Sequence, residues 1–200
     1  MLPTPSPRMN VVRKEDKEAY LKEFIQKDIS QQTGAAGLAP LRYHLVTLSL
    51  ASPVAQALAG LANELIQAGI TLHIVLARID GLASSETIES LDRVAVIRHV
   101  TDPRLLDAHE QLVMGSGTLW IGDCMRRDPA KRDAYECYGE GCTEDVAWAL
   151  RAFEKLWAAA QPIAHVPPAR TLTQSFVPDL VDPAIAITGA NGPISAATRH

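Results

Sequence analysis

The sequence has few cysteines and few aromatic residues, and it has no long apolar run. Its three cysteines are an odd number in a chain of 200 residues, which excludes a disulfide scaffold and favours a reducing compartment. The first ten residues contain three prolines and lack the apolar core of a signal peptide. No uninterrupted apolar stretch is long enough to span a bilayer. We therefore expect a cytoplasmic protein with no membrane contact.

An excess of positive charge is also absent, because the sequence has 19 Lys and Arg residues and 23 Asp and Glu residues, which gives a net charge of −4. Bulk charge therefore does not favour nucleic-acid binding, although a local basic patch remains open. Hydrophobic residues make up 47% and charged residues 21%, the balance of an ordinary globular protein. The length suits one domain with attached arms.

Composition divides the chain into three parts. Residues 1–40 form an N-terminal helical arm and linker, with a helix expected over 13–32. Residues 41–160 carry the regular apolar patterns of a domain. Residues 161–200 form a Pro-containing C-terminal arm with only four charged side chains. Such an arm has too little charge for a freely solvated tail, so we expect both arms to wrap the domain or a neighbouring copy.

The domain pattern alternates strands and helices. An apolar strand over 41–50 is followed by Ser52-Pro53, which is typical of a helix start, and by Gly69, which is typical of a helix end. A parallel partner strand follows directly, since a strand–helix–strand unit implies a crossover. Further elements are expected as a strand over 94–98, a hairpin over 110–114 and 118–122, and a helix from Thr143. The fold class predicted is α/β, a three-layer α-β-α sandwich with a mixed, mainly parallel sheet.

One stretch carries a motif-like pattern. His109 precedes the hairpin, Gly122 ends it, and Glu136 lies fourteen residues after Gly122. The closing helix ends in Phe153-Glu-Lys-Leu-Trp157. Over residues 41–158 this order resembles one half of the phospholipase D superfamily. That family's signature is H-x-K, then an Asp, a G-S-x-N turn and a more distant Glu.

The resemblance implies that His109 and Glu136 are catalytic residues, with His109 as the nucleophile. The family's other groups are replaced: Gln111 stands for the Lys, Asp123 for the Ser and Met125 for the Asn. Lys and Asn stabilise the charge that develops on phosphate oxygens, and the loss of one such donor costs about 10²–10³ in rate. We therefore expect a non-catalytic phospholipase-D-like domain that acts as a binding or assembly module.

Two alternatives stay open. A homodimer, which we expect because the family's site is a two-fold construction, could act as a phosphodiesterase with His109 as nucleophile. Alternatively, the basic loop 126–132 could bind nucleic acid or another anion, with Gln111, Asp123, Arg126 and Arg127 as ligand-binding residues. Neither a metal nor a cofactor is expected, because the cysteines do not form the paired knuckles of a zinc site.

Overall fold

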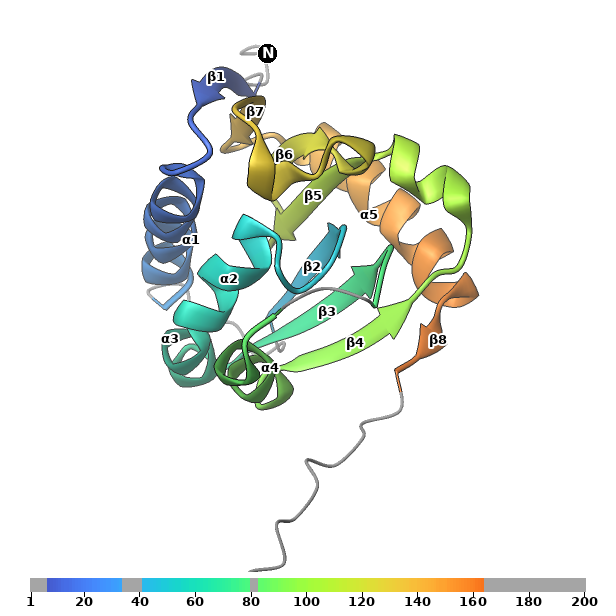
Figure 1. The fold of residues 1–200 in the computed structure, drawn as a ribbon. Helices are drawn as coiled ribbons and strands as arrows, with labels where there is room; N and C mark the ends of the chain where they lie inside the picture. The colour runs from blue at the N-terminus through green and yellow to red at the C-terminus, as the bar shows by residue number, and fades with distance from the viewer. Residues whose placement is uncertain (1–6, 34–40, 80–82, 164–200) are drawn as a thin grey trace, which may run out of the picture. The chain divides into compact units, whose positions relative to one another are not determined.

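The computed structural model describes residues 7–33, 41–79 and 83–163, which form one eight-stranded mixed sheet with helices packed on it (Figure 1). The strands are β1 (Arg8–Val12), β2 (Leu41–Thr47), β3 (Ile70–Leu76), β4 (Ala95–His99), β5 (His109–Met114), β6 (Thr118–Cys124), β7 (Ala134–Gly139) and β8 (Gln161–Pro162). The helices are α1 (Lys17–Thr33), α2 (Pro53–Gly60), α3 (Ala62–Gln67), α4 (Ser85–Asp92) and α5 (Thr143–Ala159), with short 3-10 turns η1 (Pro103–Asp107), η2 (Met125–Arg127) and η3 (Pro129–Lys131). The strand order is β1-β7-β6-β5-β2-β3-β4-β8.

The sheet is mixed, as expected, but its parallel part is smaller than the sequence pattern indicates. Among the described residues, β2–β3 and β3–β4 pair in parallel, and every other neighbouring pair is antiparallel. The difference arises because the hairpin β5–β6 joins the antiparallel side of β2 and is extended by β7 and β1. The expectation of a mainly parallel sheet is corrected accordingly.

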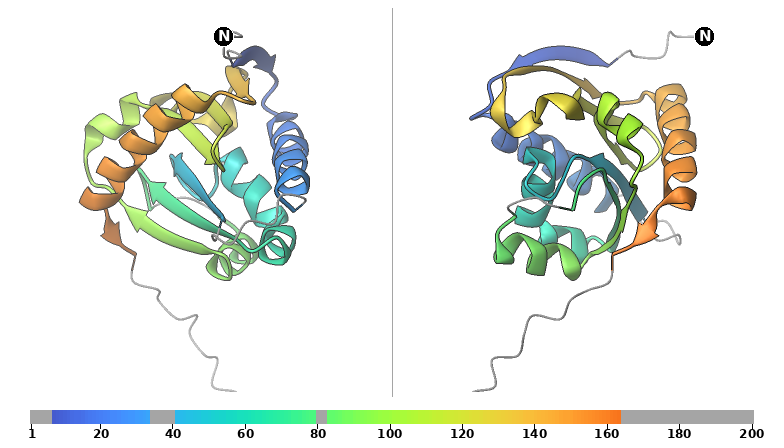
Figure 2. Two further views of the ribbon diagram at one scale, coloured as in Figure 1. Left: turned by 180° about the vertical axis from the view of Figure 1, so that it is seen from behind. Right: turned by 45° about the vertical axis from the view of Figure 1, so that its right-hand side comes forward.

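Helices lie on both faces of the sheet (Figure 2). The helices α1 to α4 lie on one face, and α5 crosses the other. The larger buried cluster lies beneath α1 to α4 and combines their leucines and isoleucines with inward residues of β2, β3, β5 and β6. A second cluster contains Phe153 of α5 and Val46 and Val75 of the sheet. No helix among the described residues is long and apolar enough to cross a membrane.

The N-terminal residues contribute to the sheet and the core. Residues 8–12, which lie in the expected N-terminal arm ahead of its helix, form β1 and pair with β7. The expected helix is present as α1, and its Leu21, Ile25 and Ile29 are buried in the larger cluster. At the other end, β8 pairs with β4, and residues 164–200 of the expected C-terminal arm lie outside the described residues.

The helix that starts at Ser52-Pro53 is interrupted once. Ser52 is the N-cap and Pro53 takes the first helical position, as the sequence predicts. At Leu61 the backbone leaves helical geometry (φ −109°, ψ 13°), so the predicted single helix is two helices, α2 and α3. The apolar face of this helical segment packs on the sheet, because Leu58, Leu61 and Leu65 are all buried in the larger cluster.

Truncating Leu61 to alanine is expected to lower the free energy of unfolding by about 2–5 kcal/mol, the range for a buried leucine whose cavity only partly collapses. Leu61 is 2% exposed, whereas the nearby Ile66 is 42% exposed. Ile66→Ala is therefore the matched control and should cost much less. Urea denaturation measures both variants, and equal midpoints for the two would show that the buried face has been misassigned.

Candidate functional site

His109 lies at the start of β5, where the β5–β6 ladder is irregular. The register shifts between His109, which pairs with Cys124, and Gln111, which pairs with Ile121. The His109 side chain is exposed, and its Nδ1 lies 2.9 Å from the Gly122 carbonyl oxygen, so the ring donates from Nδ1. This bond fixes the ring against the backbone of β6 and leaves Nε2 for other contacts.

Gln111 points toward α5. Its side-chain amide donates to the Ala149 carbonyl oxygen of that helix over 3.4 Å. Because neighbouring residues of a strand point to opposite faces, Glu110 points to the α1–α2 face instead. The residue in the place of the family's lysine is therefore engaged with a helix backbone.

Glu136 of β7 lies in the protein interior, on the side of the sheet that helices α1 to α4 cover, and is 1% exposed. Trp120 Nε1 donates to its Oε2 over 3.1 Å, and the Tyr138 hydroxyl donates to the same oxygen over 2.7 Å. The Lys17 ammonium lies 3.5 Å from Oε1. The carboxylate thus has a partner on each oxygen, and burial together with the Glu136 charge raises the pKa of Tyr138 above its ordinary value.

Lys17, which the sequence pattern did not single out, is also 1% exposed. Besides Glu136, its Nζ donates to the Pro129 carbonyl oxygen over 2.9 Å. Lys17 stands at the first position of α1, so the N-terminal helix delivers the cation to the interior. In the sequence it is one of several charged residues in a polar segment, and nothing there marks it as buried.

Glu110 is a second interior carboxylate that the sequence interpretation missed. Its Oε1 accepts from the Thr47 hydroxyl over 2.5 Å and from the Leu48 backbone N–H over 3.0 Å. It is 1% exposed, and burial raises its pKa, opposed by the bonds from Thr47, Leu48 and Ser52 and by the Lys17 charge. The alternation with the buried Leu112 and Met114 was the available signal, since all three share one face.

Asp123 is the third interior carboxylate at this end of the hairpin, at 6% exposure. Its Oδ1 accepts from the Cys124 backbone N–H over 2.7 Å and lies 3.9 Å from Arg127 Nη1. Its Oδ2 is buried and has no hydrogen-bond partner among the described residues. Within the described part of the chain, the guanidinium of Arg127, at 3.9 Å, is the cation that pairs with Asp123.

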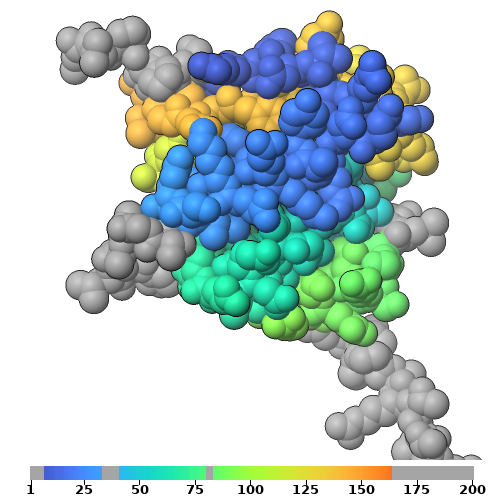
Figure 3. Space-filling view, turned by 90° about the vertical axis from the view of Figure 1, so that its left-hand side faces the viewer, coloured from blue at the N-terminus to red at the C-terminus, as the bar shows by residue number. Residues whose placement is uncertain are grey.

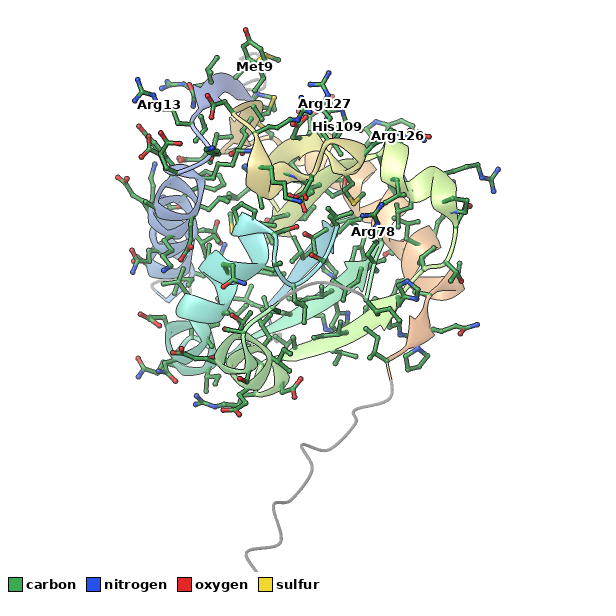
Figure 4. The ribbon with its side chains drawn as sticks, in the orientation of Figure 1. Met9, Arg13, Arg78, His109, Arg126 and Arg127 are labelled. Atoms are coloured by element: carbon green, nitrogen blue, oxygen red, sulfur yellow. The ribbon has the colours of Figure 1, made fainter. Side chains whose placement is uncertain are left out.

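The buried charged residues Lys17, Glu110, Asp123 and Glu136 are called the interior cluster below. The basic loop 126–132 lies outside this interior cluster (Figure 4). Arg126 is exposed and pairs with Asp107 over 2.6 Å. Lys131 is exposed and pairs with Asp128 over 2.7 Å. Arg132 is exposed as well. Much of the loop's positive charge is therefore compensated by neighbouring acids, each at the modest strength of a surface pair.

The balance of these groups decides what chemistry the site can perform. Glu110, Asp123 and Glu136 are three buried carboxyl groups; Lys17 lies beside Glu136 and acts on Glu110, whereas Arg127 is the cation nearest Asp123. The carboxylates of Asp123 and Glu136 accept hydrogen bonds and cannot act as the donors that stabilise a developing oxyanion. The described residues also contain no group of three or more His, Cys, Asp or Glu side chains placed to hold a metal ion.

Replacing Glu110 by glutamine is expected to remove a pH-dependent term from stability. Burial holds the folded pKa of Glu110 above its ordinary value of 4.5. The folded state therefore binds the proton more tightly than the unfolded state, and this contribution to stability is lost as pH rises through the folded pKa. Relative to Glu110→Gln, the wild type should lose stability between pH 4.5 and neutral pH. Urea midpoints of both proteins across that range measure it, and parallel pH curves would contradict it.

Solved structures share this architecture. The phospholipase D family member Nuc from Salmonella typhimurium is 12% identical, matches over 80% of this chain and 99% of its own, and gives a TM-score of 0.52. NucT from Helicobacter pylori is also 12% identical, over 78% of this chain and 98% of its own, with a TM-score of 0.51. No family model and no curated protein matches the sequence.

The chain therefore has the α/β fold of the phospholipase D family, and the predicted resemblance is confirmed at the level of the fold. At 12% identity the likeness extends to the fold alone.

Proposed function

We propose that this protein is a non-catalytic phospholipase-D-like domain that acts as a binding or assembly module. The observation that carries the proposal is the state of Glu136. Its carboxylate is buried and bound by Lys17, Trp120 and Tyr138, all from the same chain. A carboxylate that is 1% exposed and bonded in this way stabilises the fold and is closed to a substrate that approaches from solvent.

The surrounding charges support the same proposal. A phosphodiesterase of this type needs a second histidine, a cation and an amide donor around the nucleophile. Here Gln111 contacts Ala149, Asp123 is an acid, and Met125 is buried and apolar. The His109 ring is exposed and could reach a substrate. The enzyme alternative would therefore have a nucleophile but would lack the side chains that support it in this family.

Turnover of bis(p-nitrophenyl) phosphate by the purified protein tests the proposal. We expect release of p-nitrophenol at the rate of the buffer blank, with and without His109→Ala. The exposed His109 makes that variant a clean control, because its removal costs one hydrogen bond to a backbone carbonyl. Release well above the blank, abolished by His109→Ala, would establish the enzyme alternative.

The basic loop supports a second candidate, the binding of an anionic ligand or nucleic acid. Arg126, Arg127, Lys131 and Arg132 are all exposed, and Arg126 and Arg127 closely follow β6 at the hairpin end (Figure 4). Their pairing with Asp107 and Asp128 reduces the attraction, so any affinity should be weak and should fall steeply with salt. Fluorescence anisotropy with a labelled single-stranded oligonucleotide, compared for wild type and Arg126→Ala/Arg127→Ala, decides this point.

A homodimer is the assembly that we infer. The outer face of the β1–β7 pair supports it, because Met9, Val11 and Tyr135 are 65–69% exposed there and the register pairs Val11 with Tyr135. A second copy would remove this apolar surface from water. Light scattering at micromolar concentration should give twice the single-chain mass, and a single-chain mass would refute the dimer. The odd, small number of cysteines, which favours a reducing compartment, is the reason for inferring a cytoplasmic location.

A further inference from the structure

A cavity of about 710 Å³ lies between β1, α1 and β7. Figure 3 views the side of the molecule on which β1 and α1 lie next to each other. The volume falls in the range typical of small-molecule sites. None of the β5–β6 hairpin residues discussed above lines this cavity.

One wall of the cavity is aromatic. Tyr20 and Phe24 stand four residues apart on α1 and therefore share a helix face. The Phe24 ring meets the Tyr138 ring edge to face, with 5.0 Å between centroids. The Tyr138 hydroxyl is already bonded to Glu136, so Tyr138 offers its ring rather than its hydroxyl to the cavity. Such a wall suits a planar aromatic ring.

Some polar residues that line the cavity are already paired with other side chains, and others are not. Lys27 is bound to Glu140 by two contacts of 2.7 and 2.8 Å. Arg8 and Glu23, in contrast, are exposed lining residues that form no ion pair with any described residue. Asn10, two residues after Arg8, shares its strand face and adds an amide. One cation, one amide and one anion are thus left for a ligand.

We propose that this cavity binds a small planar aromatic molecule that carries one anionic group and a ring N–H donor. The ring lies against Phe24 and Tyr138. The anionic group accepts from the Arg8 guanidinium, whose fork-shaped donors match a carboxylate or phosphate, and from Asn10. Glu23 accepts from the ring N–H. Guanosine and uridine monophosphates and indole carboxylates have this chemistry.

Isothermal titration calorimetry on the full chain tests the site with two probes, GMP and indole-3-acetate, each at up to about 1 mM. Guanosine and inorganic phosphate are the controls that carry only half of the chemistry. We expect at least one probe to bind saturably and more tightly than either control. Arg8→Ala and Phe24→Leu should each weaken that probe about tenfold, since they remove the anion contact and the ring contact. Circular dichroism checks that Phe24→Leu is folded, and the exposed Arg8 gives a variant whose fold is not at risk.

The variants also distinguish this cavity from the basic loop. Binding that survives Arg126→Ala/Arg127→Ala and is weakened by Arg8→Ala supports the proposal. Binding that is insensitive to Arg8→Ala, or lost in Arg126→Ala/Arg127→Ala, would overturn it. Failure of both probes to bind would overturn it as well, and neither result would affect the proposal that the hairpin residues are non-catalytic.

Discussion

Replacing Lys17 by methionine is expected to lower the free energy of unfolding by about 3–5 kcal/mol, the cost of leaving a buried partner charge uncompensated. Lys17 is 1% exposed, lies 3.5 Å from the Glu136 carboxylate and donates to the Pro129 carbonyl oxygen. Methionine fills similar space but supplies neither charge nor donor. Glu136 would retain Trp120 and Tyr138 as donors but would lose its cation.

Two further variants make the Lys17 measurement specific. The double variant Lys17→Met/Glu136→Gln should recover part of the loss, because the remaining partner is then neutral. Lys22→Met, which removes an exposed lysine paired with Glu18 on the same helix, should cost about 0.5 kcal/mol or less. Urea unfolding at neutral pH measures all three. A Lys17→Met cost no larger than that of Lys22→Met would show that the buried pair does not hold the interior cluster.

Replacing Gly122 by alanine is expected to cost about 1–3 kcal/mol through overpacking. A Cβ built on Gly122 would lie 2.4 Å from Cη2 of Trp120, closer than any real Cβ contact. Trp120 is 2% exposed and bonded to Glu136, so its ring has no open space into which it can move. Either the Trp120 ring or the backbone at residue 122 must therefore move to make room for the added methyl group.

A double-mutant cycle identifies the Trp120 ring as the cause. In the Trp120→Phe background, the smaller ring should reduce the cost of Gly122→Ala by about 1 kcal/mol. Gly117→Ala, in the turn that precedes β6, is the matched control. A Cβ on Gly117 would meet its nearest neighbour at 3.7 Å, an ordinary van der Waals distance. Urea midpoints of the variants give the coupling. An unchanged cost in the Trp120→Phe background would place the strain elsewhere.

Much of the central architecture was predictable because its signals are local. The β5–β6 hairpin follows from Gly115-Ser-Gly117 between two apolar runs, and α5 follows from its acidic first turn and its apolar face. The first strand–helix–strand unit was equally visible, although the break at Leu61 was not. Such elements carry their own start and stop residues.

The edge strands were not predictable, since neither has a pattern of its own. β1 has four exposed residues in a row of five and depends on pairing with β7, and β8 has only two residues. The same reasoning applies to the interior cluster. Lys17 and Glu136 are 119 residues apart in the sequence and meet only through the packing of α1.

The family-like spacing of Gly122 and Glu136 at the β5–β6 hairpin shows what residue spacing can and cannot predict. Gly122 lies one residue before the position at which the resemblance places a motif glycine, and the structure gives it a local reason, the ring of Trp120 against its backbone. Glu136 falls where the resemblance places an acid, and it is bound to three side chains of its own chain. Spacing therefore located residues that matter to the fold, and it did not determine their chemical role.

Mass spectrometry of His109 after incubation with bis(p-nitrophenyl) phosphate tests the central claim most directly. In a phospholipase-D-type reaction, the His109 nitrogen attacks phosphorus, p-nitrophenolate leaves with the electron pair of its bond, and the remaining phosphoryl group stays on the ring. Samples quenched in alkali and digested should show the peptide that spans position 109 without a covalent phosphoryl adduct, in the wild type as in the His109→Ala control. An adduct on His109 of the wild-type protein would contradict the account, because it would show that the interior carboxylates do not prevent catalysis.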